Sequence, residues 1–369
     1  MKRKVCDAGC VRALAAERGP LGRSGWQQGM TWECPRLFLS GCRCGPEGRA
    51  PGRLAFCPVA DFEWERSGSE TGVPLMLTLN QLQGTPPARV VIMGAGGFVG
   101  RATLARLRRD GVEIVPLTRK EVDLLASDAA QRLAAQLTSS TTLVLTSALA
   151  PVKNPAMLLD NLRMMQAAIE AVKAQPVAHL VYVSSDAVYA DSRAPMTEAS
   201  PAEPGSLHGV MHLAREVMLK SELPGIPLAI VRPTLIFGPG DPHNGYGPNR
   251  FLRLARSGKD IVLFGEGEEQ RDHICIEDVA EIVRRCVVHR ATGVVNAISG
   301  TVTSFRTVAE LAATLFEPRV RVTGSPRQGP MPHGGYRSFD ASLLRRLFPD
   351  FTPVDLRAGL ERMRATDSR

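Results

Sequence analysis

The clearest chemical pattern in this sequence is a set of three glycines spaced three residues apart, Gly94, Gly97 and Gly100. They follow an apolar run at residues 89–93 and open a stretch with helical periodicity. Glycines in such a turn let the backbone approach a pyrophosphate, and the start of the following helix presents N–H groups to that charge. The spacing is G-x-x-G-x-x-G, because Val99 stands where G-x-G-x-x-G would have glycine. Together with Phe98 and Val99, the three glycines predict a dinucleotide site.

The end of the next apolar run indicates which dinucleotide is preferred. A carboxylate there would bind the ribose 2′-hydroxyl of NAD, but this sequence has Thr118, Arg119 and Lys120. Two cations attract a 2′-phosphate and can hydrogen-bond to it. We therefore expect NADP as the preferred cofactor, with NAD as the alternative if both cations are only solvated loop charges.

The predicted elements around this loop alternate between strands and helices. Strands are expected at residues 89–93, 112–117, 143–146, 180–183 and 228–231, with helices at 101–110 and 156–174. Gly111 stands where a glycine ends a helix. Alternation of this kind predicts the α/β class with a doubly wound parallel sheet, the Rossmann arrangement. Further helices are expected near 249–257, 277–288 and 304–316, in a smaller mixed lobe over the carboxyl edge of the sheet.

Length and composition divide the chain into three parts. The predicted dinucleotide-binding domain covers residues 88–237, and residues 238–365 form mainly a substrate-binding lobe. Residues 1–80 are unassigned, since their first 75 lack periodicity and hold six of the eight cysteines in spacings that match no zinc template. We expect a disordered or non-native extension there, with Met76 as an alternative start, although a metal-binding module stays open.

The bulk properties also exclude some classes of protein. The formal charge of +8 is spread along the chain, so nucleic-acid binding is not expected. No apolar run approaches the ~18 residues that a membrane-spanning helix needs. No signal peptide is expected either, because the basic start is not followed by an apolar segment.

From residue 88 to about 363 the sequence resembles the extended short-chain dehydrogenase/reductase superfamily, in particular its NAD(P)-dependent epimerase/dehydratase family of sugar-nucleotide enzymes. The resemblance rests on motifs in the family's order: the glycine loop, Thr146-Ser147-Ala148, Ser184-Ser185-Asp186-Ala187-Val188-Tyr189, Arg232-Pro233, Phe237-Gly238-Pro239-Gly240-Asp241 and Arg271-Asp272-His273. It implies cofactor contacts at Asp123, Leu124, Ala148 and Pro233. Asn161 and Ser185 stand at positions that the family uses in catalysis, and Asp186, Asn249, Arg271 and Arg337 are the implied substrate contacts. For Asn249 and Arg337 an ordinary surface or turn role is the alternative.

The sequence departs from the family at the catalytic pair. The family has Tyr-x-x-x-Lys, in which the tyrosine moves the proton while the lysine lowers its pKa and holds the nicotinamide ribose. This sequence has His208 and His212 at those positions, and none of its tyrosines has a lysine four residues later. Imidazole titrates near pH 6.5, so His208 could be a substitute acid and base without a lysine.

Two other hypotheses stay open for this pair of histidines. The site could be weakened or inactive, so that the protein binds a dinucleotide as a sensor or interaction module. Alternatively, His208, His212 and Glu216 share one helical face and could ligate a metal, although no further ligand is identifiable and no metal is expected.

The resemblance also narrows the reaction. The family's 4,6-dehydratases follow the serine with Asp-Glu, whereas here Asp186 is followed by Ala187. We therefore expect an epimerase or 4-keto-reductase acting on a nucleotide-activated sugar or a similar polar substrate. The resemblance further implies a cytoplasmic enzyme and a homodimer formed through a helix pair.

Overall fold

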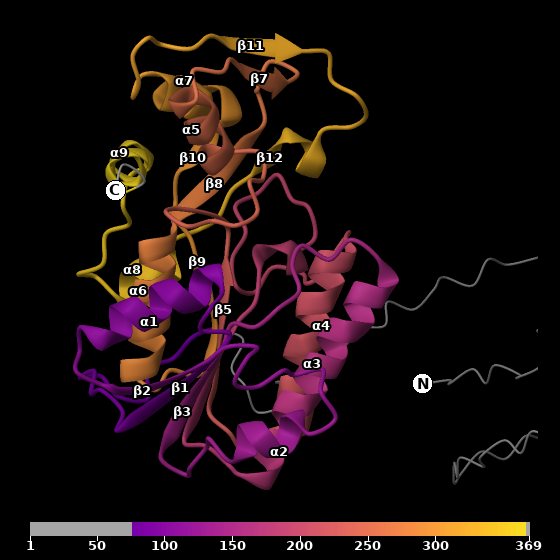
Figure 1. Cartoon of the computed structure of the whole chain (residues 1–369), viewed down its shortest axis with the longest axis vertical. Helices are drawn as coiled ribbons and strands as arrows, with labels where there is room; N and C mark the ends of the chain where they lie inside the picture. The colour runs from indigo at the N-terminus through magenta and orange to yellow at the C-terminus, as the bar shows by residue number, and fades with distance from the viewer. Residues whose placement is uncertain (1–75, 367–369) are drawn as a thin grey trace, which may run out of the picture. The chain divides into compact units, whose positions relative to one another are not determined.

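The computed structural model describes residues 76–366, and the expectations for residues 1–75 lie outside this range. A six-stranded parallel sheet occupies the first part of the fold in the order β2-β1-β3-β4-β5-β9 (Figure 1). Its strands, in chain order, are β1 (Arg89–Met93), β2 (Glu113–Leu117), β3 (Thr141–Leu145), β4 (His179–Val183), β5 (Leu228–Pro233) and β9 (Gly293–Ala297). The α/β class and the doubly wound parallel sheet predicted from the sequence are confirmed.

Helices cover both faces of the sheet, as Figure 1 shows. One face carries α1 (Phe98–Arg108), α6 (Ile276–Val288) and α8 (Ser342–Leu347), and the other carries α2 (Ala129–Ala134), α3 (Pro155–Ala174) and α4 (Leu207–Glu222). Alternate residues of β1 enter the two cores: Val90 and Ile92 pack towards α6, while Val91 and Met93 pack towards α3. Because both faces are buried, the strands read as continuous apolar runs in the sequence.

The smaller lobe is built from short strands and helices. β8 (Gln270–Cys275) pairs with β10 (Val302–Ser304), β12 (Tyr336–Arg337) and β6 (Leu235–Phe237), while β7 (Ile261–Phe264) pairs with β11 (Val322–Ser325). The helices α5 (Pro248–Arg256), α7 (Phe305–Ala313) and α9 (Leu356–Thr366) share a separate core with these strands. Two short 3-10 helices, η1 (Asp186–Val188) and η2 (Pro332–Gly335), lie in the connections.

Part of the chain beyond residue 238 returns to the parallel sheet. After the first strands of the smaller lobe, α6 packs against α1, and β9 then pairs in parallel with β5. Residues 276–297 therefore belong to the parallel sheet and its helical layer. This return could not be predicted from local periodicity, because the pairing joins strands far apart in the sequence.

Residues 76–80 also belong to the fold, although the sequence left them unassigned. Leu77 is buried, and its N–H donates to the carbonyl of Val294 in β9. Thr78 forms an antiparallel bridge with Thr292 just before that strand. Gly293 permits this contact, because a Cβ atom there would lie 2.3 Å from the carbonyl oxygen of Met76.

Candidate active site

The glycine loop is a cradle made of backbone. Gly94 has φ +97°, and a Cβ there would lie 2.7 Å from the backbone nitrogen of Ser147. A Cβ on Gly100 would lie 2.1 Å from the carbonyl oxygen of Gly94. Helix α1 begins at Phe98, so Phe98, Val99 and Gly100 form its first turn, and Gly97 provides no side-chain cap. The first N–H groups of α1 therefore remain for a ligand at the carboxyl edge of the sheet.

The end of β2 holds a carboxylate that the sequence analysis overlooked. The Oε2 atom of Glu121 accepts hydrogen bonds from the backbone N–H and the hydroxyl of Thr118, at 2.8 and 2.6 Å. Arg119 donates to Asp123 at 3.0 Å, with 74% of its side chain exposed. Asp123 also accepts from the N–H of Leu125, which orders the turn beside the buried Leu124. An exposed cation and a held carboxylate thus flank the predicted ribose position.

Asn161 supports the chain after β3 and has no free proton for catalysis. Its Oδ1 accepts from the N–H of Leu149, while its Nδ2 donates to the carbonyls of Leu149 and Met157. Both amide protons are thus used and the side chain is fully buried, while the catalytic role expected for Asn161 stays a prediction. In the structure Asn161 positions the loop that follows Ser147 and Ala148.

Helix α4 carries the two histidines and docks closely on η1. Its start is capped by Ser206, whose hydroxyl accepts from the N–H of Gly209 at 3.1 Å. A Cβ atom at Gly209 would lie 2.0 Å from the carbonyl oxygen of Ala187. The absence of a side chain at Gly209 therefore lets the first turn of α4, with His208, approach Ser185 and Asp186.

Asp186 joins three of the predicted site residues. Its carboxylate accepts a weak hydrogen bond from the Ser185 hydroxyl at 3.4 Å. It also forms an ion pair with Arg337, whose Nε donates to it at 3.0 Å. Arg337 is buried, and it also donates to the backbone carbonyl of Asp186 and to Asp191. The negative charge of Asp186 partly offsets the effect of burial, which lowers the pKa of His208.

The two histidines lie edge to face, with ring centroids 4.8 Å apart. His212 is buried, and its Nδ1 lies 2.9 Å from the hydroxyl of Tyr182 on β4. Burial, together with the charges of His208 and Arg215, holds the pKa of His212 well below its usual range. His212 is therefore a neutral imidazole, whereas a lysine at this position would carry a charge.

Glu216 is committed to a buried ion pair, which argues against the metal hypothesis. Arg232 binds both of its carboxylate oxygens, at 2.9 and 2.6 Å, and the Ser184 hydroxyl donates to Oε1 at 2.6 Å. A carboxylate so occupied cannot ligate a cation together with the two histidines. No group of three or more possible metal ligands occurs within residues 76–366.

Arg215 and Tyr182 belong to the site but were not found by sequence reasoning. Arg215 is 1% exposed, and it donates to the carbonyl of Ser147 at 2.9 Å from the same face of α4 as His208 and His212. The spacing 208, 212, 215, 216 places all four side chains on one helical face, which was the available signal. Tyr182 was noted only as part of an apolar strand.

The remaining predicted substrate residues do not all meet. Asn249 binds the N–H and carbonyl of Gly238 with its amide, so it fixes the loop after β6. Arg271 pairs with Glu269 and lies beside Arg337, its register partner in the neighbouring strand. Pro233 ends β5 and is buried at the sheet edge. Arg271 and Arg337 thus lie side by side, each already paired with a carboxylate, while the structure gives Asn249 a role in the loop.

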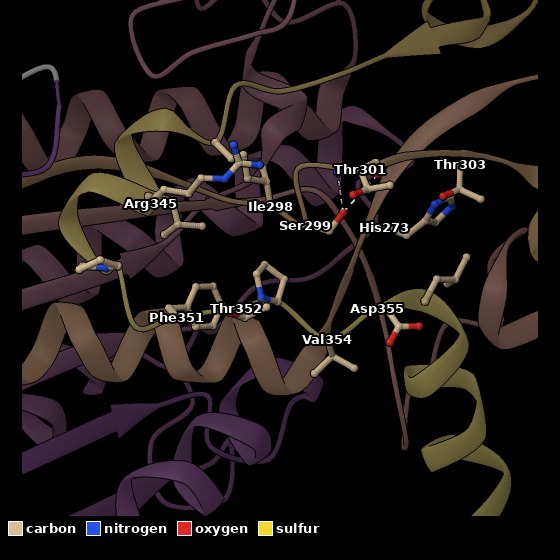
Figure 2. A pocket seen from close by; sticks show the side chains of 15 residues that line it. His273, Ile298, Ser299, Thr301, Thr303, Arg345, Phe351, Thr352, Val354 and Asp355 are labelled. Carbon is tan, nitrogen blue, oxygen red and sulfur yellow. Dashed lines mark hydrogen bonds between the residues drawn. The ribbon is translucent and has the colours of Figure 1, made fainter.

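Figure 2 shows a cavity lined by none of the predicted site residues. It measures about 560 Å³ and lies between β8, the loop after β9 and the segment that leads into α9. His273 lines it, and both ring nitrogens of this buried side chain have no hydrogen-bond partner among the described residues. This cavity is separate from the site built around the glycine loop and α4.

The residues present fit a nicotinamide dinucleotide at the site. Gly94 and Gly100 leave no room for a Cβ, which keeps the loop as tight as a backbone contact with a pyrophosphate requires. Beside Gly94, the buried Oγ of Ser147 has no hydrogen-bond partner within the described part of the chain, and on α4 the same holds for Nδ1 of His208 and Nε of Arg215. A ligand that reached these atoms would satisfy them, although buried atoms without a partner also occur elsewhere in the described fold.

Comparison with known proteins agrees with this geometry. Residues 90–298 match the NAD dependent epimerase/dehydratase family, which is more than half of the chain. The dTDP-L-rhamnose 4-epimerase of Burkholderia thailandensis is 33% identical over 150 residues, which cover 38% of this chain and 40% of that relative. The aligned segment thus spans well under two thirds of the relative's length. The dTDP-4-dehydro-6-deoxy-D-allose reductase of Streptomyces bikiniensis is 25% identical over 74% of this chain and 94% of its own.

Solved structures show the same fold. An epimerase of Methanothermobacter thermautotrophicus superposes with a TM-score of 0.69 at 22% identity, covering 78% of this chain and 94% of that one. A UDP-N-acetylglucosamine 4-epimerase from Bacillus cereus gives a TM-score of 0.66 at 21% identity, covering 75% and 96%. No helix within residues 76–366 is long and apolar enough to cross a membrane.

Proposed function

Because the chain belongs to the NAD dependent epimerase/dehydratase family, we propose that it is an NAD(P)-dependent enzyme acting on a nucleotide-activated sugar. The observation that supports the proposal is the close docking of α4 on η1, in which Gly209 lies against Ala187 and the charge of Asp186 acts on His208. The names of the relatives support an epimerase or a keto-reductase.

Each group near His208 has a distinct task in the proposed reaction. The bound nicotinamide would supply or accept a hydride at a ring carbon of the sugar. His208 moves the proton at the oxygen of that carbon, since its lowered pKa keeps the imidazole neutral at physiological pH. The Ser185 hydroxyl hydrogen-bonds to the same oxygen, and Asp186, held by Arg337, orients Ser185 and faces His208.

The class of reaction follows from what stands next to Asp186. Expelling water from a sugar needs both an acid and a base, and Ala187 provides neither. We therefore propose epimerisation or 4-keto reduction rather than 4,6-dehydration. Arg271 is the cation proposed to bind the nucleoside diphosphate, since guanidinium groups bind phosphate oxygens in pairs, and Arg337 lies beside it and holds Asp186.

For the cofactor we propose NADP(H) over NAD(H). The exposed Arg119 and Lys120 at the end of β2 support this choice, because a 2′-phosphate would pair with them. The carboxylate of Glu121 opposes it, but this group is held by Thr118 through two hydrogen bonds. Titration with NADPH and NADH compares the two directly.

The competing function is a dinucleotide-binding protein with a weakened site. It is favoured by the neutral His212, which stands where the family carries a lysine. The test is turnover of dTDP- and UDP-sugars by the wild type and by a His208→Tyr, His212→Lys variant. Turnover by the wild type supports the enzyme, whereas turnover by the variant alone would establish the weakened site.

We further propose that the protein is a homodimer and that it works in the cytoplasm. Leu159 on α3 and Val210 and Val217 on α4 are large apolar side chains that are 38–56% exposed. Val210 and Val217 are seven residues apart and thus share a helical face, as expected for a helix pair that meets its copy. Sedimentation velocity of the wild type and of a Leu159→Glu, Val217→Glu variant tests this assembly.

A further inference from the structure

Arg215 is a buried cation without a carboxylate. Its side chain forms no ion pair within residues 76–366, and its Nε has no hydrogen-bond partner. The guanidinium donates to the carbonyl of Ser147 and lies 5.4 Å from the ring centroid of Tyr182. Removing a charge from water costs several kcal/mol unless something compensates it. One carbonyl and one aromatic ring compensate this charge only in part.

The surroundings of Arg215 lead directly to the cofactor stretch. Ser147 belongs to the motif after β3 in which Ala148 is the implied cofactor contact, and its own hydroxyl is also unpartnered. On the other side, the Tyr182 hydroxyl lies 2.9 Å from Nδ1 of His212. Arg215 therefore contacts both the predicted cofactor wall and the residue that orients His212.

We infer that Arg215 provides the fixed positive charge of this site, and that through Tyr182 it holds His212 as a neutral donor with its proton on Nε2. The inference rests on the proposed function, because it places the charge beside a bound nicotinamide. Two residues would then share what one lysine does elsewhere in the family: Arg215 contributes the charge, and His212 contributes an N–H directed at the ligand.

The arrangement of protons follows from the contacts. Burial raises the pKa of the Tyr182 phenol and the nearby Arg215 charge lowers it, so the phenol keeps its proton at physiological pH. A phenol that keeps its proton can donate it to Nδ1 of a neutral imidazole, and when it does so the imidazole carries its own proton on Nε2. The charge of Arg215 makes Tyr182 a better donor and thus favours this tautomer.

A fixed positive charge beside the nicotinamide acts differently on its two redox forms. The oxidised ring is cationic and is repelled, whereas the reduced ring is neutral. In a buried site this repulsion is poorly screened. We therefore expect the wild type to bind NADPH more tightly than NADP⁺. The ratio of the two dissociation constants should be smaller in a variant that lacks the charge.

The first experiment measures the dissociation constants of NADPH and NADP⁺ by titration calorimetry. Arg215→Gln keeps a donor for the Ser147 carbonyl but removes the charge, and Arg215→Lys keeps the charge. We expect Arg215→Gln to reduce the preference for NADPH by about fivefold, and Arg215→Lys to stay within about twofold of the wild type. Adding His212→Lys to Arg215→Gln should restore the preference, because a cation returns to the site.

A purely structural role for Arg215 gives a different result. Arg215→Gln would then lower the melting temperature but leave the ratio of the two dissociation constants unchanged, which would overturn the inference. The same holds if the His212→Lys addition restores nothing in a folded protein that binds both forms.

A second measurement does not depend on cofactor binding. Two-bond ¹H–¹⁵N correlation spectra distinguish the tautomers of a neutral histidine, and we expect His212 to carry its proton on Nε2. Tyr182→Phe should give a mixture of tautomers, and Arg215→Gln should move the signals in the same direction. A proton on Nδ1 in the wild type would contradict the inference. Absence of binding to NADP(H) and NAD(H) would instead refute the proposed function. The tautomer of His212 would then be the measurement that supports or contradicts the inference.

Discussion

The glycine loop and the inward face of α4 border the same predicted ligand, yet they are built in different ways. The loop at residues 94–100 is made of backbone held so closely that no Cβ fits at Gly94 or Gly100. The face of α4 is made of side chains, His208, His212 and Arg215, that differ from the family's pattern. The loop exposes Gly96 and Gly97, whereas His212 and Arg215 on α4 are buried.

The difference shows which parts of such a site can be replaced. A backbone cradle has no substitute, because any side chain would occupy the space of the neighbouring carbonyl or of the ligand. A charge or a proton donor can come from another position on the same helical face, if the side chain reaches the same place. The glycine loop of the family is therefore retained in this chain, while the side chains on the inward face of α4 differ from the family's.

The largest effect is expected from closing the cradle. In Gly100→Val the new Cβ would lie 2.1 Å from the carbonyl oxygen of Gly94, so the loop and α1 must move apart. Overpacking of this kind costs about 1–3 kcal/mol, which corresponds to a loss of roughly 10- to 100-fold in NADPH affinity by calorimetry. Gly225→Ala, which meets nothing within 4 Å, is the control. Equal affinities for both variants would show that the loop is not the cradle.

The second effect separates the two regions. Gly209→Ala puts a Cβ 2.0 Å from the Ala187 carbonyl oxygen and pushes α4 away from η1. We expect turnover to fall by about 10- to 100-fold because His208 is misplaced, while NADPH affinity changes little. Gly205→Ala precedes the helix in open space and should leave both unchanged. A parallel loss of binding in Gly209→Ala would mean that the two regions are not independent.

The pH dependence sharpens the same contrast. Burial lowers the pKa of His208, so the imidazole is neutral above pH 6.5 and becomes protonated only at lower pH. Sugar oxidation, which needs the neutral base, should therefore be constant through neutral pH and decline below pH 6.5. Asp186 raises this pKa, so Asp186→Asn should move the decline to still lower pH. If the midpoint of the pH–activity profile is unchanged in Asp186→Asn, His208 is not the acid and base of the reaction. The affinity for the cofactor should not depend on pH in this range.

The smallest effect concerns selectivity at the rim of the loop. Arg119 is 74% exposed, so its pairing with a 2′-phosphate is worth about 0.2–1 kcal/mol. We expect Arg119→Ala to weaken NADPH by at most about fivefold and to leave NADH unchanged. Glu121→Gln should improve NADPH binding by a similar factor. The opposite pattern, with NADH weakened by Glu121→Gln, would assign the site to NAD.

The sequence predicted the regular part of the fold well. The strands at β1, β4 and β5 and the long helix α3 have strong apolar patterns, and the structure places them within a few residues of the expected ranges. The pairing of β9 with β5 and the short strands β6, β10 and β12 were not foreseen. Strands of two to five residues carry little periodicity, and their partners are distant in the sequence.

The site was predicted unevenly, for a physical reason. Motif spacing predicts roles for the glycine loop, Ser185 and His208, because these residues stand at fixed positions in strand–turn–helix units. Asn161 and Asn249 were predicted to serve catalysis and substrate binding, and in the structure their amides bind the backbone of nearby loops. Helical spacing could have placed Arg215 on the face of His208 and His212, but its contact with Tyr182 depends on how α4 docks on β4, which no local pattern encodes.

The short stretch at residues 76–80 has a consequence for keeping the protein in solution. β9 is the last strand of the sheet, and Leu77, Thr78 and Asn80 occupy the backbone groups on and beside its outer side. An uncovered edge of a sheet offers its free N–H and carbonyl groups to any other strand and so favours aggregation. A chain shortened to begin at residue 88 would keep every residue of the proposed active site. It would, however, expose the unpaired backbone groups of β9, the edge strand opposite β2, and should aggregate more readily.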